Sequence, residues 1–412
     1  MNYLIKAPKI LNEKINLPAS KSISNRVLIL NSLCDHPDKI RNISVCDDTN
    51  VMRRALHGDN RKIDIGAAGT AMRFLTAYLS VKSGTWTISG TERMKNRPIK
   101  LLVDALKLSG AEIEYMEKEG FPPLQIKGQT LAGGHVYLDG GVSSQYISAL
   151  LMIAPLMTNG LSLHLMGNVV SVPYIKLTIR LMQIFGVVVF EEGQTFTVPP
   201  QQYSAAGDFA VEPDWSAASY WYEMIALCKN EDARISLPGL LPDSLQGDAS
   251  VAALFDRLGV KTTFTSSGVT LTKKEKETNS LLTFDFVSMP DMAQTAVVTC
   301  AMLGIPFRFN GLQSLKIKET DRLEALKIEL GKFGYPITVY DGNVLVWNGQ
   351  KSHSAQAPVV ATYEDHRMAM AFAPVAICRQ DGINISNPEV VSKSYPSYWE
   401  DLQKSGFSIT SH

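Results

Sequence analysis

The stretch IELGKFGYPITVYDGNVLVW (residues 328–347) decides the fold, because it reads as the end of a helix, a glycine and a β-hairpin. The same order recurs in four other stretches, which are residues 104–128, 181–198, 254–272 and, in a shorter form, 401–410. In each stretch a glycine follows the apolar helical pattern, and these glycines are Gly110, Gly186, Gly259, Gly334 and Gly406. Glycine suits the left-handed C′ position that ends a helix, so we expect a helix end at each.

The five glycines recur at intervals of 72 to 76 residues. This period is too long for a solenoid, whose repeats run to roughly 20–50 residues, and it suits a compact unit of two helices and several strands. A related segment lies upstream, where DDTNVMRRALHG (residues 47–58) ends at Gly58. There the hairpin is reduced to DNRKIDI (residues 59–65). We therefore expect six related units, the first of them abbreviated.

One helix in each later unit is apolar nearly all round. These helices are expected at residues 71–80, 146–157, 218–228, 293–304 and 368–379. A helix with that profile is buried rather than lying on the surface. Because short strands flank such helices, the sequence predicts an α/β fold with helices inside and sheets outside.

Length, charge and cysteine content indicate the number of domains and exclude several classes of protein. A chain of 412 residues suggests two domains, and 40 basic against 40 acidic residues give no support to a nucleic-acid or membrane-surface role. The five cysteines are scattered without a C-x-x-C pair, so we expect reduced core thiols rather than a disulfide framework or a zinc site. No stretch offers about 18 uninterrupted apolar residues, which predicts a soluble, cytoplasmic protein.

Basic side chains lie just before or inside the first turn of several apolar helices. They are Lys21, Arg26, Arg73, Arg97, Arg322 and Arg367. A helix N-terminus carries unpaired N–H groups and a partial positive charge, so a cation there is disfavoured unless an anion offsets it. The pattern predicts an anionic ligand.

Each motif has a simpler interpretation when taken alone. LPASKSISNR (residues 17–26) could be a helix cap, KIKETDRLEAL (residues 316–326) could neutralise itself through internal ion pairs, and Asp291 could be an N-cap or a general base. Together the motifs recur at the same place in the unit, which favours substrates with several phosphate and carboxylate groups. No metal-ligand spacing or dinucleotide fingerprint accompanies them.

Nine motifs resemble the 5-enolpyruvylshikimate-3-phosphate synthase family, in order and over nearly the whole chain. They are LPASKSISNR, AGTAMRFL, RMKNRPIKLLVDAL, VSSQYISALLMIAPL, VSVPYI, PDMAQTA, IKETDRL, YEDHRMAMAFA and VSKSYPSYWEDL. The resemblance implies a two-domain inside-out α/β barrel with three βαβαββ units in each domain. It implies one domain of residues 1–18 plus 213–412, another of residues 19–212, and an active site in the cleft between them.

The family transfers the enolpyruvyl group of phosphoenolpyruvate to the 5-hydroxyl of shikimate 3-phosphate, and releases phosphate. The resemblance implies three catalytic residues, which are Asp291 as proton acceptor, Glu319 as proton donor, and Lys21. Shikimate 3-phosphate would contact Lys21, Ser22, Arg26, Ser143, Ser144, Gln145, Ser171, Tyr174, Asp291 and Lys318. Phosphoenolpyruvate would contact Lys21, Gly69, Arg97, Gln145, Arg322, Arg367 and Lys393.

The resemblance implies a monomer that acts on small anionic substrates, without a cofactor or metal and without nucleic-acid or membrane partners. Two alternatives stay open: a UDP-N-acetylglucosamine enolpyruvyl transferase, and a catalytically weak paralogue that binds anions. The first uses a loop cysteine, and residues 86–105 contain none. Ala67 and Phe74 depart from the family's usual Asn and Pro, and Val172 and Ser314 differ as well. The first two flank the expected phosphoenolpyruvate loop, so they bear on affinity for that substrate.

Overall fold

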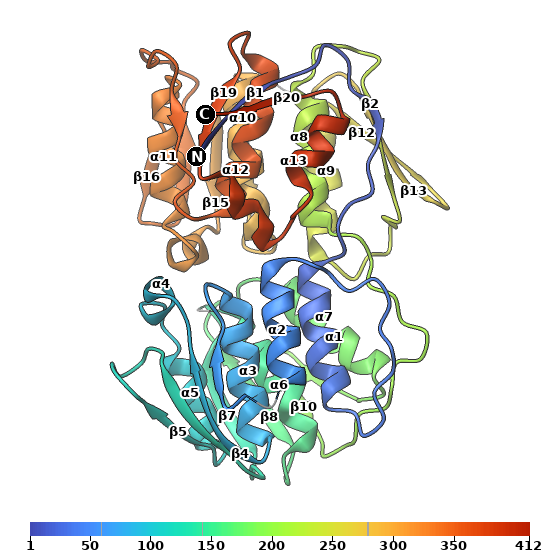
Figure 1. The fold of residues 1–412 in the computed structure, drawn as a ribbon, viewed down its shortest axis with the longest axis vertical. Helices are drawn as coiled ribbons and strands as arrows, with labels where there is room; N and C mark the ends of the chain where they lie inside the picture. Colours follow the sequence, from blue (N-terminus) through green and yellow to red (C-terminus); the bar gives the residue numbers. More distant parts are fainter. Residues whose placement is uncertain (59, 142, 278–279) are drawn as a thin grey trace. The chain divides into compact units, whose positions relative to one another are not determined.

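The computed structural model describes residues 1–58, 60–141, 143–277 and 280–412. The chain forms two compact units (Figure 1): unit 1 is Met1–Pro18 with Glu212–His412, and unit 2 is Ala19–Val211. Asp59, in the expected short hairpin, and Val142, which opens the VSSQ motif, lie outside the described residues.

One repeat of unit 1 shows the βαβαββ pattern in full. Its elements are β14 (Leu282–Asp285), α10 (Ala293–Leu303), β15 (Phe307–Asn310), α11 (Arg322–Lys332), β16 (Thr338–Tyr340) and β17 (Val344–Trp347). β14 and β15 are parallel, while β17 pairs antiparallel with both β15 and β16. The sheet order is therefore β14-β15-β17-β16, with one parallel pair followed by a hairpin.

The other two sheets of unit 1 each recruit a strand from the start of the chain. Their orders are β2 (Asn12–Lys14), β11 (Arg234–Pro238), β13 (Gly268–Lys273), β12 (Val260–Thr265), and β18 (Val359–Val360), β19 (Ile383–Ser386), β1 (Asn2–Lys6), β20 (Ser408–Ser411). β1 takes the place of the missing last strand, and its Asn2 exchanges backbone hydrogen bonds of 3.0 Å with His412. The helices of these repeats are α8 (Trp215–Leu227), α9 (Val251–Arg257), α12 (His366–Phe372) and α13 (Tyr398–Lys404).

Unit 2 holds two sheets of the same design in the part of the chain that is described. They are β3 (Lys62–Asp64), β4 (Gly84–Ser89), β6 (Leu124–Gly128), β5 (Glu112–Tyr115), and β7 (Gly134–Asp139), β8 (Leu161–Met166), β10 (Thr195–Val198), β9 (Phe190–Glu192). Their helices are α3 (Gly69–Val81), α4 (Glu92–Lys95), α5 (Lys100–Leu108), α6 (Ser144–Ile153) and α7 (Val172–Ile184).

The abbreviated first repeat consists of α1 (Lys21–Ser32) and α2 (Asp47–His57). The DNRKIDI segment is not a remnant of its hairpin, as the sequence suggested, because β3 lies in this segment and pairs in parallel with β4. It is thus the first strand of the second repeat. With this repeat counted, each unit contains three repeats.

The repeated glycines end helices as predicted. Gly110, Gly186, Gly259, Gly334 and Gly406 have φ of 102°, 82°, 92°, 83° and 90°, a region that side chains with a Cβ rarely adopt. At the first of them, the Ala111 N–H donates to the Leu106 carbonyl, which closes a Schellman-type cap. Gly58 differs, because its φ of −93° lies in a region that any residue can adopt.

The apolar helices are buried as expected. In α8 every residue except Ser216 is buried, and α10 is buried from Ala293 to Ala301. Four cysteines are free and buried, but Cys378 is exposed, so the expectation of a core thiol is wrong there. It lies at the last residue of a 3₁₀ helix, Ala373–Cys378, beyond the part that packs inside. Within the described residues, no helix is long and apolar enough to cross a membrane.

Candidate functional site

Several helices of unit 2 begin at the residues expected to bind anions. α1 begins at Lys21, α3 at Gly69 and α6 at Ser144, and none of them has an acidic residue in its first turn. Ser143 caps α6 by accepting from the Gln145 N–H, whereas the N-cap of α3 is Ala68, which has no side-chain oxygen. The first N–H groups of α3 are therefore suited to an anion.

Lys21 lies beside an acidic partner that the sequence analysis did not identify. Its Nζ is 3.3 Å from Oδ2 of Asp48, and both side chains are largely buried. Asp48 belongs to the first turn of α2, where an acidic residue reads as an ordinary helix start. The ion pair fixes the ammonium group at the start of α1.

Arg26 lies inside unit 2 and is 3% exposed. Its guanidinium donates to Oγ1 of Thr178 at 2.7 Å, Oγ of Ser148 at 3.2 Å, and the carbonyls of Ser22 and Tyr174 at 2.9 and 3.4 Å. Burial lowers the pKa of Arg26 to about 10. Arg26 therefore connects α1, α6 and α7.

Phe74 packs against Arg26. Its ring lies 5.3 Å from the guanidinium carbon, and its side chain is buried. This departure from the family pattern thus contributes a cation–π contact inside unit 2.

Ser171, which precedes α7, has a φ of 56°, and its side chain does not cap that helix.

Gly69, Arg97 and Gln145 come together in unit 2. A Cβ atom on Gly69 would lie 2.5 Å from Nη1 of Arg97, so the absence of a side chain lets the guanidinium approach the backbone. Nε2 of Gln145 donates to Oγ1 of Thr70 at 3.1 Å. Arg73 donates to the carbonyls of Gly69 and Pro98, at 3.0 and 3.2 Å, and so fixes the two loops to each other.

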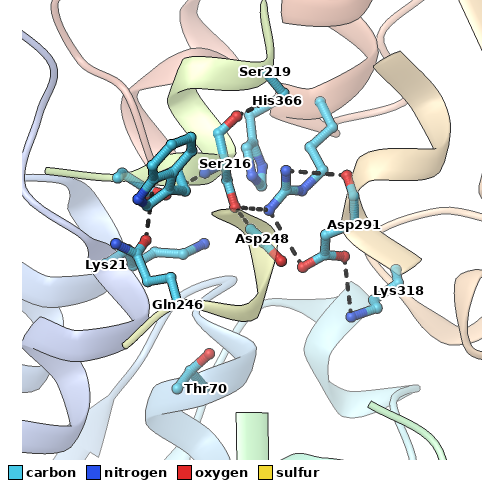
Figure 2. A network of polar contacts seen from close by, with 12 residues as sticks. Lys21, Thr70, Ser216, Ser219, Gln246, Asp248, Asp291, Lys318 and His366 are labelled. Carbon is cyan, nitrogen blue, oxygen red and sulfur yellow. Dashed lines mark hydrogen bonds and ion pairs between the residues drawn. The ribbon is translucent and has the colours of Figure 1, made fainter. Parts of the chain in front are cut away.

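A dense ionic cluster in unit 1 centres on Asp291. Its Oδ1 is 2.9 Å from Nη1 of Arg322 and 3.4 Å from Nζ of Lys318, and its Oδ2 is 3.3 Å from Nη2 of Arg367. Figure 2 shows Asp291 beside Lys318, with Ser216 and Asp248 close by. Three cations of the expected site thus share one carboxylate.

Arg322 connects this cluster to two further carboxylates. Its Nε donates to Oδ2 of Asp365 at 2.7 Å, and its Nη2 donates to Oε2 of Glu319 at 3.0 Å. Arg322 is 2% exposed and Asp365 is fully buried. Asp365 also caps α12, because it accepts from the Arg367 N–H at 2.9 Å. One carboxylate therefore positions both arginines.

The cluster shifts the ionisation of its members. Burial by itself would raise the pKa of Asp291, but Arg367, Lys318 and Arg322 outweigh it and hold this pKa well below its usual range. Burial lowers the pKa of Lys318 despite the attraction of Asp291. Burial also opposes the charge of Arg322, yet Asp365, Glu319 and Asp291 raise its pKa. At neutral pH Asp291 is therefore ionised.

Lys393 ends a 3₁₀ helix, Pro388–Lys393, that packs against α12, the helix carrying Arg367.

The structure brings together two groups of the expected site residues. They are Asp291, Lys318, Glu319, Arg322 and Arg367 in unit 1, and Gly69, Arg97 and Gln145 in unit 2. No group of three or more His, Cys, Asp or Glu residues in the described ranges could hold a metal ion.

Asp248 and Ser216 belong to the same network, but sequence analysis missed both. Asp248 precedes α9 in QGDAS (residues 246–250), and Ser216 follows Asp214 at the start of α8. In sequence both are typical of helix starts, so only the long-range contacts identify them.

Comparisons with known proteins agree with this arrangement. The model of the EPSP synthase family (3-phosphoshikimate 1-carboxyvinyltransferase) matches residues 5–59 and 57–402. A 3-phosphoshikimate 1-carboxyvinyltransferase from Bacteroides fragilis strain YCH46 is 55% identical over 410 residues, which cover 99% of each chain. One from Sulfurovum sp. is 34% identical over 433 aligned positions, covering 98% of this chain and 99% of the relative.

The fold is also that of solved structures. An EPSP synthase from Acinetobacter baumannii superposes with a TM-score of 0.78 at 19% identity, and the match covers 100% of both chains. A second structure of EPSP synthase from the same organism gives a TM-score of 0.76 at 18% identity. At such identities the likeness concerns the fold, whereas the family match and the 55% identical relative concern the sequence itself. The chain belongs to the EPSP synthase family of carboxyvinyl transferases.

Proposed function

We propose that this chain transfers the enolpyruvyl group of phosphoenolpyruvate to the 5-hydroxyl of shikimate 3-phosphate, in the route to chorismate and the aromatic amino acids. The observation that carries the proposal is the ionic cluster of unit 1, in which Lys318, Arg322 and Arg367 surround Asp291. Two strongly anionic substrates repel each other, and such a set of fixed cations offsets that repulsion. Family membership supports the same reaction.

The substrate contacts are part of the proposal. Shikimate 3-phosphate binds Arg26, which Thr178 and Ser148 hold in place. Its other contacts are Lys21, Ser22, Ser143, Ser144, Gln145, Ser171 and Tyr174 of unit 2, and Asp291 and Lys318 of unit 1. Phosphoenolpyruvate binds Lys21, Gln145 and Arg97 beside Gly69 and, in unit 1, Arg322, Arg367 and Lys393. The cleft between the two domains, the monomeric state and the cytoplasmic location stay predictions.

In the proposed reaction, Asp291 accepts the proton of the 5-hydroxyl of shikimate 3-phosphate. The oxygen of this hydroxyl attacks C2 of phosphoenolpyruvate at the same time. Glu319, which must be protonated in the substrate complex, gives its proton to C3, and this produces a tetrahedral intermediate. Glu319, now a carboxylate, takes a C3 proton back while the C2–O bond to phosphate breaks. This releases phosphate and restores the double bond, and Lys21 stabilises the charge on the departing phosphate. Substrate anions draw Arg322 and Arg367 away from Asp291, so binding raises the basicity of this carboxylate when it is needed.

The decisive experiment supplies the purified chain with phosphoenolpyruvate and one of two acceptors. With shikimate 3-phosphate we expect phosphate release and, by NMR, an enolpyruvyl ether at the 5-position. With UDP-N-acetylglucosamine we expect neither. Transfer to the sugar nucleotide would favour the alternative transferase, and release with neither acceptor would contradict the proposed function.

Replacing Gly69 with alanine should weaken phosphoenolpyruvate binding selectively. The new Cβ would lie 2.5 Å from Nη1 of Arg97, and this end of a flexible side chain would move aside without unfolding the unit. We expect KM for phosphoenolpyruvate to rise about tenfold, the loss of one charge-assisted contact, with KM for shikimate 3-phosphate within about twofold. Steady-state kinetics with each substrate varied in turn would measure this.

Gly331→Ala is a matched control. Gly331 also lies in a helix, α11, but a Cβ there meets nothing within 4 Å. We expect unchanged kinetics and a slightly higher melting temperature, because alanine favours the helix. If both variants changed KM equally, the contact between Gly69 and Arg97 would not be the cause.

A further inference from the structure

A buried carboxylate behind Arg367 has no part in the reaction described above. Asp248 lies in a 3₁₀ helix, Gly247–Ser250, and is 3% exposed. The Ser216 hydroxyl, at the start of α8, donates a short hydrogen bond to Oδ2 of Asp248. Nη2 of Arg367 in turn donates to Oγ of Ser216 at 3.4 Å. Asp248, Ser216 and Arg367 therefore form a chain of polar contacts, part of which is visible in Figure 2.

Hydrogen bonds from the side chains of Gln246 and Asp214 to the backbone hold Asp248 and Ser216 in place. Gln246 accepts from the Trp215 N–H at 3.1 Å and donates to the Pro213 carbonyl at 2.8 Å, which fixes the segment of Asp248 to the start of α8. Asp214 caps the same helix by accepting from the Ser216 N–H at 2.8 Å. Asp248 and Ser216 therefore keep their separation independently of the side chains around Asp291.

The direction of the hydrogen bonds between Asp248, Ser216 and Arg367 determines whether Ser216 attracts Arg367. An ionised carboxylate can only accept, and a serine hydroxyl has a single proton. When ionised Asp248 accepts a hydrogen bond from the Ser216 hydroxyl, the lone pairs of the Ser216 oxygen face Arg367 and attract its guanidinium. If Asp248 were neutral, the hydroxyl proton could turn toward Arg367 and would then repel it.

The charges around Asp248 come from three elements. Asp291 lies in the 3₁₀ helix Pro290–Met292 that precedes α10, Asp214 caps α8, and Arg367 lies in the first turn of α12. Burial, followed by the charge of Asp291, raises the pKa of Asp248 to about 6, while Ser216 and Arg367 oppose this rise and Asp214 adds to it. The charge of Asp248 therefore changes just below neutral pH.

We propose that Asp248 is a positioning residue for the phosphoenolpyruvate site, acting through Ser216 on the guanidinium of Arg367. The proposal rests on the proposed function, in which Arg367 binds this substrate. It concerns affinity rather than the proton transfers, since the hydrogen bonds of Asp248 reach the site through Ser216 and Arg367, which binds substrate.

The test compares the wild type with Asp248→Asn, which has the same shape without the charge. At pH 8 we expect KM for phosphoenolpyruvate to rise about three- to tenfold in the variant, the usual net contribution of one hydrogen bond, with kcat within about twofold. The ratio of the two KM values should approach one as the pH falls from 8 to 5, because wild-type Asp248 becomes protonated. Protonation of the substrate affects both proteins alike and cancels in the ratio.

Two further variants separate the relay from loop packing. Ser216→Ala should raise KM by a similar factor, and the double variant Ser216→Ala/Asp248→Asn should be no worse than Ser216→Ala alone. Ser244 lies in the loop before Asp248, and its hydroxyl donates to Glu212 and accepts from the Gln246 N–H. Ser244→Ala therefore perturbs loop packing without touching the relay, and its KM should stay within about twofold of the wild type. Circular dichroism and thermal melting verify that each variant is folded.

Each result of these experiments contradicts either the role of Asp248 alone or the proposed function as well. A KM ratio that does not change with pH, additive effects in the double variant, or an equal effect of Ser244→Ala would overturn the positioning role and leave the proposed function intact. Absence of turnover in the wild type would overturn the proposed function and, with it, the role of Asp248.

Discussion

Asp291→Asn should lower kcat by about 10²- to 10⁴-fold, the usual contribution of a positioned general base. Asparagine keeps the shape of the side chain but cannot accept the proton of the 5-hydroxyl. The same change removes the carboxylate that Lys318, Arg322 and Arg367 share, at 3.4, 2.9 and 3.3 Å. An anionic substrate then no longer competes with Asp291 for these cations, so KM for phosphoenolpyruvate should stay the same or fall.

Single-turnover phosphate release and equilibrium binding of phosphoenolpyruvate would measure the two effects separately. Asp285→Asn is a suitable control, because Asp285 is an exposed acid of the same repeat that accepts from the Val287 N–H. Its kcat should stay within about twofold of the wild type, since surface substitutions rarely have larger effects. A kcat for Asp291→Asn near that of the wild type would show that another group takes the proton.

Arg322→Met should lower the free energy of unfolding by about 3–5 kcal/mol, the cost of breaking a buried ion pair by removing one partner. Arg322 is 2% exposed and contacts Asp291, Glu319 and the fully buried Asp365. Methionine fills much of the space but leaves these carboxylates without that cation. Turnover should also be lost, because Arg322 belongs to the phosphoenolpyruvate contacts.

Urea unfolding at several pH values would measure this loss and its cause. The ion pairs depress the pKa of Asp291, so their stabilisation is present above about pH 4 and is lost as the pH falls below it. The wild type and Arg322→Met should therefore converge in stability at acid pH. A control is Lys327→Met on the same helix, an exposed partner of Glu324, whose loss should cost less than about 1 kcal/mol. An equal loss in both variants would contradict the buried-pair explanation.

The sequence was sufficient for the repeat, because a repeated pattern is a local signal. Gly334 and its four counterparts could be placed at helix ends, since a left-handed backbone favours glycine whatever surrounds it. The inside-out arrangement followed from helices such as α8 and α10, whose apolar residues leave no solvent-facing side.

The partners of the site residues could not be predicted, because they depend on contacts between distant segments. Arg26 is expected to bind substrate, and its donors also reach Ser148 and Thr178, which are 122 and 152 residues away and were not foreseen. Asp248 read as a helix start, and only the fold brings it to Ser216. The reduced hairpin of residues 59–65 was misread for the same reason, since pairing with β4 decides to which repeat a strand belongs.

The use of β1 in a sheet with β19 and β20 has a consequence for synthesis on the ribosome. β1 is made before the strands that flank it, since β19 follows about 380 residues later and β20 about 405 residues later. Unit 2 is one continuous segment, Ala19–Val211, so it can fold while unit 1 is still being translated. If unit 2 folds at that stage, residues 1–18 stay without their partners in unit 1, and premature release would leave β1 exposed as a strand without neighbours.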